Sequence, residues 1–143
     1  MTTPAEIVAE AREWIGTRWD HQQRLKGVGT DCAGMVIGIA HVLLGFDAAI
    51  EAYNRAPGIN NSLLRLCAVH MTRVRRPALG RVAVMRFEGE KLSHHLGVFG
   101  DYPFGGLSLI HAYAQSRKVV EHRFDEAWSA RVVAVFVLPG VVE

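Results

Sequence analysis

The sequence predicts a single α+β domain in which N-terminal helices, one of them buried on all sides, pack against an antiparallel sheet of about five strands. Helix-type patterns occupy the first half of the chain, and short runs rich in β-branched and aromatic residues, separated by turn residues, fill the second half. The length of 143 residues fits one domain over residues 1–143, and 50% of the residues are hydrophobic, which is enough for a core.

The chain opens with a helix signal. Thr3 and Glu6 form a capping box, with Pro4 at the first helical position. The apolar positions that follow share one helical stripe: Ile7, Val8, Ala11, Trp14 and Ile15. The pattern predicts a helix over about 4–15 and, because residues 16–30 show no period, an irregular loop after it.

A second helix is predicted over 32–44, where nearly every residue is apolar or small, with Gly45 as its terminating glycine. A helix that is apolar all round is a buried helix. Gly34 and Gly38 lie on one face and indicate close contact with a sheet or another backbone. Residues 46–61 are predicted to be a loop. A short helix follows, with one apolar face that makes Cys67 a core residue: Leu63, Leu66, Cys67, His70 and Met71.

Five strands are predicted in the second half of the chain, over residues 82–87, 95–99, 107–113, 118–124 and 132–138. Strands that follow one another through short turns favour an antiparallel meander.

Composition narrows the possible functions. The net charge of +2 is far from that of a dedicated nucleic-acid binder, so nucleic acid is not an expected partner. The longest apolar run, residues 35–44, is too short to span a membrane. The first residues lack the basic and apolar segments of a secretory signal, so we expect synthesis in the cytoplasm without a signal peptide.

Cys32 is a candidate nucleophile because it opens the buried helix. Unpaired N–H groups and the positive end of the helix dipole favour an anion there, which predicts a lowered thiol pKa. The alternative is that Cys32 is an ordinary buried small hydrophobe.

Three histidines strengthen the catalytic interpretation. His95 lies two residues before Gly97, so both share a strand face with room beside the imidazole. His111 follows 16 residues after His95, a spacing that suits the neighbouring antiparallel strand. A cysteine, a histidine and a polar orienting group in this order are typical of papain-like sites. His94 competes with His95 for the base role, but neighbours on a strand face opposite ways, and the Gly97 register favours His95.

At these residues the sequence resembles the NlpC/P60 cysteine peptidases, which cleave peptide bonds in bacterial cell-wall stems. The resemblance runs from about residue 7 to 136 and rests on the Asp-Cys-Ala-Gly of residues 31–34, the His-Leu-Gly of 95–97 and the Ile-His of 110–111. More narrowly, residues 14–17, 21–22 and 26–32 resemble the phage-tail and gene-transfer-agent branch of that family.

The resemblance implies a papain-like NlpC/P60 fold with Cys32 as nucleophile, His95 as general base and His111 as the group that orients His95. It also implies a substrate-binding role for three residues near the nucleophile: His21, Trp19 and Asp31. Trp19 stands where the family often has a tyrosine, and Arg81 stands where it commonly has an aspartate.

We therefore expect a thiol endopeptidase or amidase of peptidoglycan stem peptides, without a cofactor. The resemblance further implies phage-tail structural proteins as partners, and a location in the virion or tail with action in the cell envelope. Two other functions stay open: a non-catalytic tail or wall-binding module, and an acyltransferase that uses the same Cys-His pair. A zinc site made by Cys32 and His94, His95, His111 and His122 is disfavoured, because no pair has a typical ligand spacing.

Overall fold

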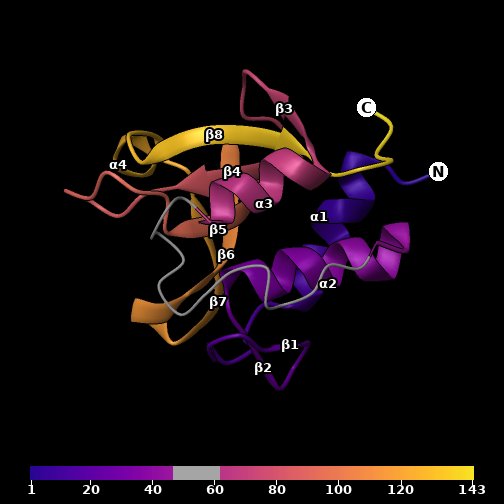
Figure 1. The fold of residues 1–143 in the computed structure, drawn as a ribbon, viewed down its shortest axis with the longest axis horizontal. Coiled ribbons are helices and arrows are strands. Elements are labelled where there is room, and N and C mark those ends of the chain that lie inside the picture. The colour runs from indigo at the N-terminus through magenta and orange to yellow at the C-terminus, as the bar shows by residue number, and fades with distance from the viewer. Residues whose placement is uncertain (47–61) are drawn as a thin grey trace.

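The computed structural model describes residues 1–46 and 62–143, in which helices pack against one six-stranded antiparallel sheet (Figure 1). The sheet has the order β3-β8-β4-β5-β6-β7, so β4 to β7 form the predicted meander. The helices are α1 (Pro4–Glu13), α2 (Cys32–Leu44), α3 (Ser62–His70), α4 (Glu126–Ser129) and the 3₁₀ turn η3 (Ala114–Ser116). The strands are β1 (Arg24–Leu25), β2 (Gly29–Thr30), β3 (Thr72–Val74), β4 (Val82–Met85), β5 (His95–Asp101), β6 (Leu107–Tyr113), β7 (Lys118–Arg123) and β8 (Val132–Val137).

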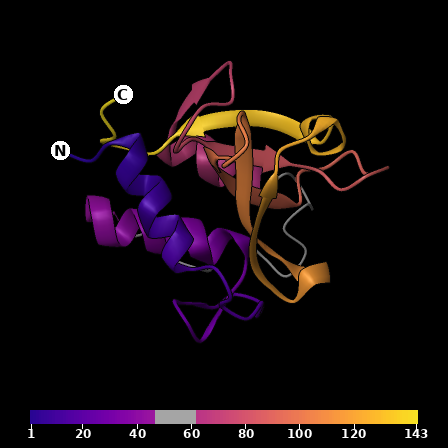
Figure 2. The same ribbon diagram turned by 180° about the vertical axis from the view of Figure 1, so that it is seen from behind.

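Helix α1 begins as its capping box predicts. The Thr3 hydroxyl oxygen accepts a hydrogen bond from the Glu6 backbone N–H at 3.3 Å. The helix ends at Glu13, two residues earlier than predicted, and Ile15 is 45% exposed, so its assignment to the apolar stripe is wrong. Figure 2 shows α1 lying across α2.

Helix α2 has the predicted bounds, with Gly45 at φ +66° as its left-handed cap. All nine residues from Cys32 to Ala40 are buried. A Cβ at Gly38 would lie 2.5 Å from the Trp14 ring, and one at Gly34 would overlap the Gln23 carbonyl oxygen. Gly34 therefore permits the predicted backbone contact, whereas Gly38 makes room for the ring of Trp14, the residue that follows α1.

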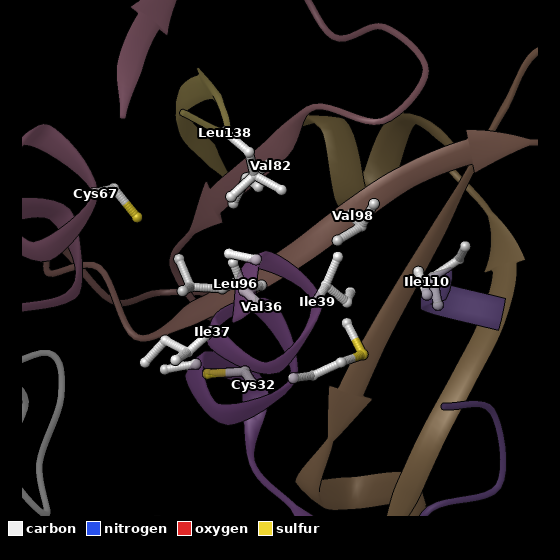
Figure 3. Close-up of a cluster of buried hydrophobic side chains, with 14 of the residues drawn as sticks. Cys32, Val36, Ile37, Ile39, Cys67, Val82, Leu96, Val98, Ile110 and Leu138 are labelled. Carbon is white, nitrogen blue, oxygen red and sulfur yellow. The ribbon is translucent and has the colours of Figure 1, made fainter. Parts of the chain in front are cut away.

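The core lies between α2 and one face of the sheet (Figure 3). Leu96 and Val98 of β5 point toward α2, together with Ile110 of β6. Cys67 of α3 is fully buried in the same core, as predicted. The opposite face of the sheet carries a second, smaller cluster around Met85 and Leu109.

The sheet differs from the predicted meander at its last strand, because β8 pairs with β4 and not with β7, and it also differs at its margins. Strand β3 adds a sixth strand by pairing with β8, and the segment predicted to be an irregular loop contains the two-residue strands β1 and β2. The loop predicted over 46–61 lies, apart from Phe46, outside the described residues. No helix in the described part of the chain is long and apolar enough to cross a membrane.

The edge strand β7 is fastened to α1 and β6 by an ionic clamp. The Arg12 guanidinium binds the Glu121 carboxylate at 2.9–3.0 Å and the Asp101 carboxylate at 2.9 Å. The Ser108 hydroxyl donates to the same Glu121 carboxylate at 2.6 Å. The clamp holds β7 in register beside β6.

Candidate active site

Cys32 is the first residue of α2, and Asp31 caps that helix. The Asp31 Oδ1 atom accepts from the Gly34 N–H at 2.7 Å, and its Oδ2 atom accepts from the Gln22 N–H at 2.7 Å. The carboxylate thus joins the preceding loop to the start of the helix. Cys32 itself is 7% exposed.

The pKa of Cys32 contradicts the prediction of a lowered value. Burial, followed by the negative charge of Asp31, raises the pKa of the Cys32 thiol to about 12. Hydrogen bonding to the Leu96 and Ala33 backbone N–H groups lowers the pKa, but by less than burial raises it. The Cys32 thiol is therefore neutral at neutral pH.

His95 and His111 lie in hydrogen-bond contact on neighbouring strands, as their spacing predicts. His95 is the first residue of β5, and its Nε2 atom lies 2.5 Å from the Nδ1 atom of His111 on β6. Beyond His111, the chain of contacts continues: its Nε2 atom lies 2.8 Å from Nε2 of His122 on β7. The His122 Nδ1 atom lies 2.9 Å from the backbone oxygen of Arg123.

Burial keeps the inner two imidazoles neutral. His95 is 3% exposed, and desolvation, followed by electrostatic interactions with Arg131 and His122, lowers its pKa to about 3. Desolvation also lowers the pKa of the fully buried His111 well below its ordinary value. A neutral imidazole has one nitrogen that donates a hydrogen bond and one that accepts, so each ring can pass a hydrogen-bond direction to the next.

Gly97 leaves space on its strand face for neighbouring side chains. A Cβ at Gly97 would lie 2.8 Å from the Leu109 side chain, 3.2 Å from that of Met85 and 3.3 Å from the Cβ of His111, so a larger residue would force these side chains to shift. The space beside His95 on this face is therefore filled by side chains of β4 and β6.

His94 lies outside β5 and outside the histidine chain. Its ring stacks on Phe87 at 5.7 Å, and its Nε2 atom lies 3.8 Å from a Glu90 carboxylate oxygen. The backbone N–H of Leu96, the residue that follows His95, forms a hydrogen bond with the Cys32 sulfur. The starts of α2 and β5 are thus neighbours, and His95 rather than His94 belongs to the histidine network.

The three predicted substrate-binding residues lie at or before the start of α2. Trp19 pairs with Thr30, and its ring centroid is 6.4 Å from that of His21. The His21 Nδ1 atom lies 3.9 Å from Asp31 Oδ2. Asp31 is 3% exposed and binds two backbone N–H groups, so it holds this loop against the start of α2. Trp19 and His21 are partly exposed.

Sequence reasoning missed two residues of the network. His122 entered it only as a possible metal ligand, although β7 places His122 opposite Leu109 and hence on the face of His111. Trp128 of α4 packs edge-on against the His111 ring, with centroids 5.0 Å apart. The two-residue periodicity of adjacent strands could have identified His122, but nothing local in the sequence predicts the position of Trp128.

The described residues, 1–46 and 62–143, contain no group of three or more His, Cys, Asp or Glu side chains arranged to hold a metal ion. The histidine nitrogens instead face one another at hydrogen-bond distance.

Comparison with known proteins identifies the fold. No protein-family model matches the chain, and no curated protein matches it in sequence. Among solved structures, the NlpC/p60 domain of the peptidoglycan hydrolase SagA matches with a TM-score of 0.65 and 21% identity, over 96% of this chain and 100% of that domain. NlpC1 from Trichomonas vaginalis matches with a TM-score of 0.65 and 12% identity, over 96% of this chain and 45% of its own length.

An NlpC/P60 family protein from Bacillus cereus matches with a TM-score of 0.65 and 14% identity, over 93% of this chain and 39% of its own length. The chain therefore spans less than half of each of these two longer proteins and the whole of the SagA domain. These likenesses, together with helices packed on an antiparallel sheet, show that the chain has the NlpC/P60 fold.

Proposed function

We propose that this protein is a cysteine hydrolase that cleaves peptide bonds in peptidoglycan stem peptides. The observation that carries the proposal is the juxtaposition of a cysteine at the start of a buried helix with a strand whose His95 is hydrogen-bonded to His111. The shared fold adds support, since one structure with this fold is the domain of a peptidoglycan hydrolase.

The proposed reaction begins with a neutral thiol. His95 takes the Cys32 proton on its Nδ1 atom, because its Nε2 atom is occupied by His111. The sulfur then bonds to the scissile carbonyl carbon, and the backbone N–H of Cys32 at the helix start stabilises the oxyanion. When the intermediate collapses, the carbon–nitrogen bond breaks and the protonated His95 gives its proton to the leaving amine.

A water molecule completes the cycle. His95 removes a proton from the water as its oxygen attacks the thioester carbon, and the carbon–sulfur bond then breaks. The protonated His95 returns its proton to the departing sulfur, so the products are a carboxylic acid and the regenerated thiol. His111 holds the imidazole of His95 in place throughout, as the positioning partner.

Substrate binding is assigned to the loop before α2. The Nε2 atom of His21 is buried and makes no hydrogen bond within the described residues. A peptide carbonyl or carboxylate would satisfy this nitrogen, and the neighbouring Trp19 ring would offer an apolar surface. Asp31 acts on the substrate only indirectly, by holding this loop against Cys32.

The test is incubation with purified peptidoglycan followed by mass spectrometry of the released peptides. We expect wild-type protein to release fragments with new free amine and carboxyl ends, and Cys32→Ser to release none. Cys67→Ala is the matched control, because it removes the other buried thiol, which lies on α3 and not at the start of α2. Absence of fragments from folded wild-type protein would refute hydrolysis and favour a wall-binding module.

Acyl transfer is distinguished in the same assay. An added amine of a second stem peptide would appear joined to the donor carbonyl if transfer competes with water. A cross-linked product in place of the free acid would reassign the reaction while leaving the role of Cys32 intact.

We further propose that a phage-type tail carries the protein to the cell envelope. Support comes from residues 14–17, 21–22 and 26–32, which resemble the tail-associated branch. Mass spectrometry of tail-like particles purified from the organism that encodes the chain should detect it; particles that lack it would refute this delivery route.

A further inference from the structure

The hydrogen-bond chain that ends at Arg123 has a fixed direction. A backbone carbonyl oxygen only accepts hydrogen bonds, so the His122 Nδ1 atom, 2.9 Å from the Arg123 oxygen, must carry a hydrogen. In a neutral imidazole only one nitrogen carries a hydrogen, which leaves Nε2 of His122 as an acceptor.

The direction propagates inward through two more rings. Nε2 of His111, 2.8 Å from Nε2 of His122, must then donate, which leaves Nδ1 of His111 as an acceptor. Nε2 of His95 contacts that atom and therefore donates to it. The lone pair of His95 is consequently on Nδ1, the nitrogen that the proposed reaction needs as a base.

We propose that His122 is a positioning residue that sets the tautomers of His111 and His95, and so determines which nitrogen of His95 is basic. This inference rests on the proposed function for its catalytic consequence, but not for its geometry. A doubly protonated His122 would donate from Nε2 and reverse the chain, leaving His95 with a hydrogen on Nδ1 and no basic lone pair there.

The surroundings of the network hold its rings in this arrangement. The Trp128 ring centroid lies 5.1 Å from that of His122 and 5.0 Å from that of His111, and the Arg131 guanidinium lies over the same indole, 4.4 Å from its centroid. Packing of one indole against both imidazoles restricts their rotation and keeps the hydrogen-bonded nitrogens facing one another.

The test is ¹⁵N NMR of the histidine side chains, which reports the tautomer of each ring directly. In the folded wild-type protein we expect the hydrogen on Nε2 in both His95 and His111, and on Nδ1 in His122. In His122→Leu we expect His111 to populate both tautomers. His122→Gln should retain the wild-type pattern, because its amide oxygen can accept from His111. His41→Leu, an exposed histidine at the end of α2, is the matched control.

Turnover on peptidoglycan is the second measurement. We expect His122→Leu to lower kcat by about tenfold. The loss should be smaller than the loss from changing a residue that is bonded directly to the catalytic imidazole, because His122 acts on His95 only through His111. His122→Gln should recover most of that loss, and His41→Leu should have wild-type turnover.

Two results would overturn the inference: a hydrogen on Nδ1 of His111 in the wild-type protein, or unchanged tautomers of His95 and His111 in folded His122→Leu. If His122→Leu does not fold, the wild-type and His122→Gln spectra still test the proposed tautomers of His95 and His111. The spectra need no substrate. A protein that lacks peptidase activity but shows the expected tautomers would therefore refute the proposed function and leave the role of His122 standing.

Discussion

Replacing Asp31 by asparagine separates its two effects on Cys32, because asparagine keeps one oxygen and loses the charge. Asparagine caps helices about as well as aspartate, so the hydrogen bond to the Gly34 N–H is retained. The Gln22 N–H, which donates to the second carboxylate oxygen at 2.7 Å, would instead face an NH₂ group.

These contacts give the expected magnitudes. Loss of the acceptor for a partly buried N–H costs about 1–3 kcal/mol of unfolding free energy. The pKa of Cys32 should fall, because the Asp31 charge is the second cause of its rise, but it should stay above 9.0 since burial is the first. Each unit of fall raises the thiolate fraction about tenfold at a fixed pH below the pKa.

The assay is the rate of iodoacetamide alkylation at each cysteine, resolved by mass spectrometry of the digested protein. Cys67 is an internal control, because burial alone raises its pKa to about 12. In Asp31→Asn the rate at Cys32 should rise while the rate at Cys67 stays constant. An unchanged or slower Cys32 rate in the folded variant would refute the electrostatic role of Asp31.

Three other expectations concern the network, the helix contact and acid stability. His111→Ala should lower turnover and His111→Gln should restore part of it; equal turnover in wild type and His111→Ala would contradict the positioning role. Gly38→Ala places a methyl group 2.5 Å from the Trp14 ring, so urea denaturation should show a loss of about 1–3 kcal/mol, although alanine favours the helix by about 1 kcal/mol. An equally stable variant would contradict that packing. Because the pKa of His95 falls from 6.5 to about 3, the unfolded chain binds a proton first as pH drops below 6.5. Stability should therefore fall by up to about 1.4 kcal/mol per pH unit for this group, and His95→Gln should flatten the profile; an unaltered slope would contradict the buried neutral state.

The sequence predicts much of the fold because local patterns of apolar residues and glycines determine most of its helices and strands. The all-apolar composition of residues 32–44 and the glycine after them predict α2 to the residue, and the 16-residue spacing of His95 and His111 predicts adjacent strands. The strands β1 and β2 are only two residues long, too short for any periodicity to reveal.

The site is less predictable because its chemistry depends on tertiary burial. A helix start lowers the pKa of a cysteine, and that local signal is present at Cys32. The opposing desolvation comes from the sheet and from α3, which local sequence does not show, and it outweighs the helix effect. His122 was missed as a network member for a related reason: its role depends on the pairing of β6 with β7.

The position of β7 at the edge of the sheet has a consequence for how often the site is complete. An edge strand can open locally while the rest of the sheet stays folded, with a free energy smaller than that of global unfolding. Whenever β7 opens, His122 departs while His95 and His111 remain on their strands. The clamp from Arg12 to Glu121, the residue before His122, opposes that opening. The ion pair between Arg12 and Glu121 should therefore raise the fraction of molecules in which His122 completes the histidine network, and hydrogen exchange of the β7 amides would measure that fraction.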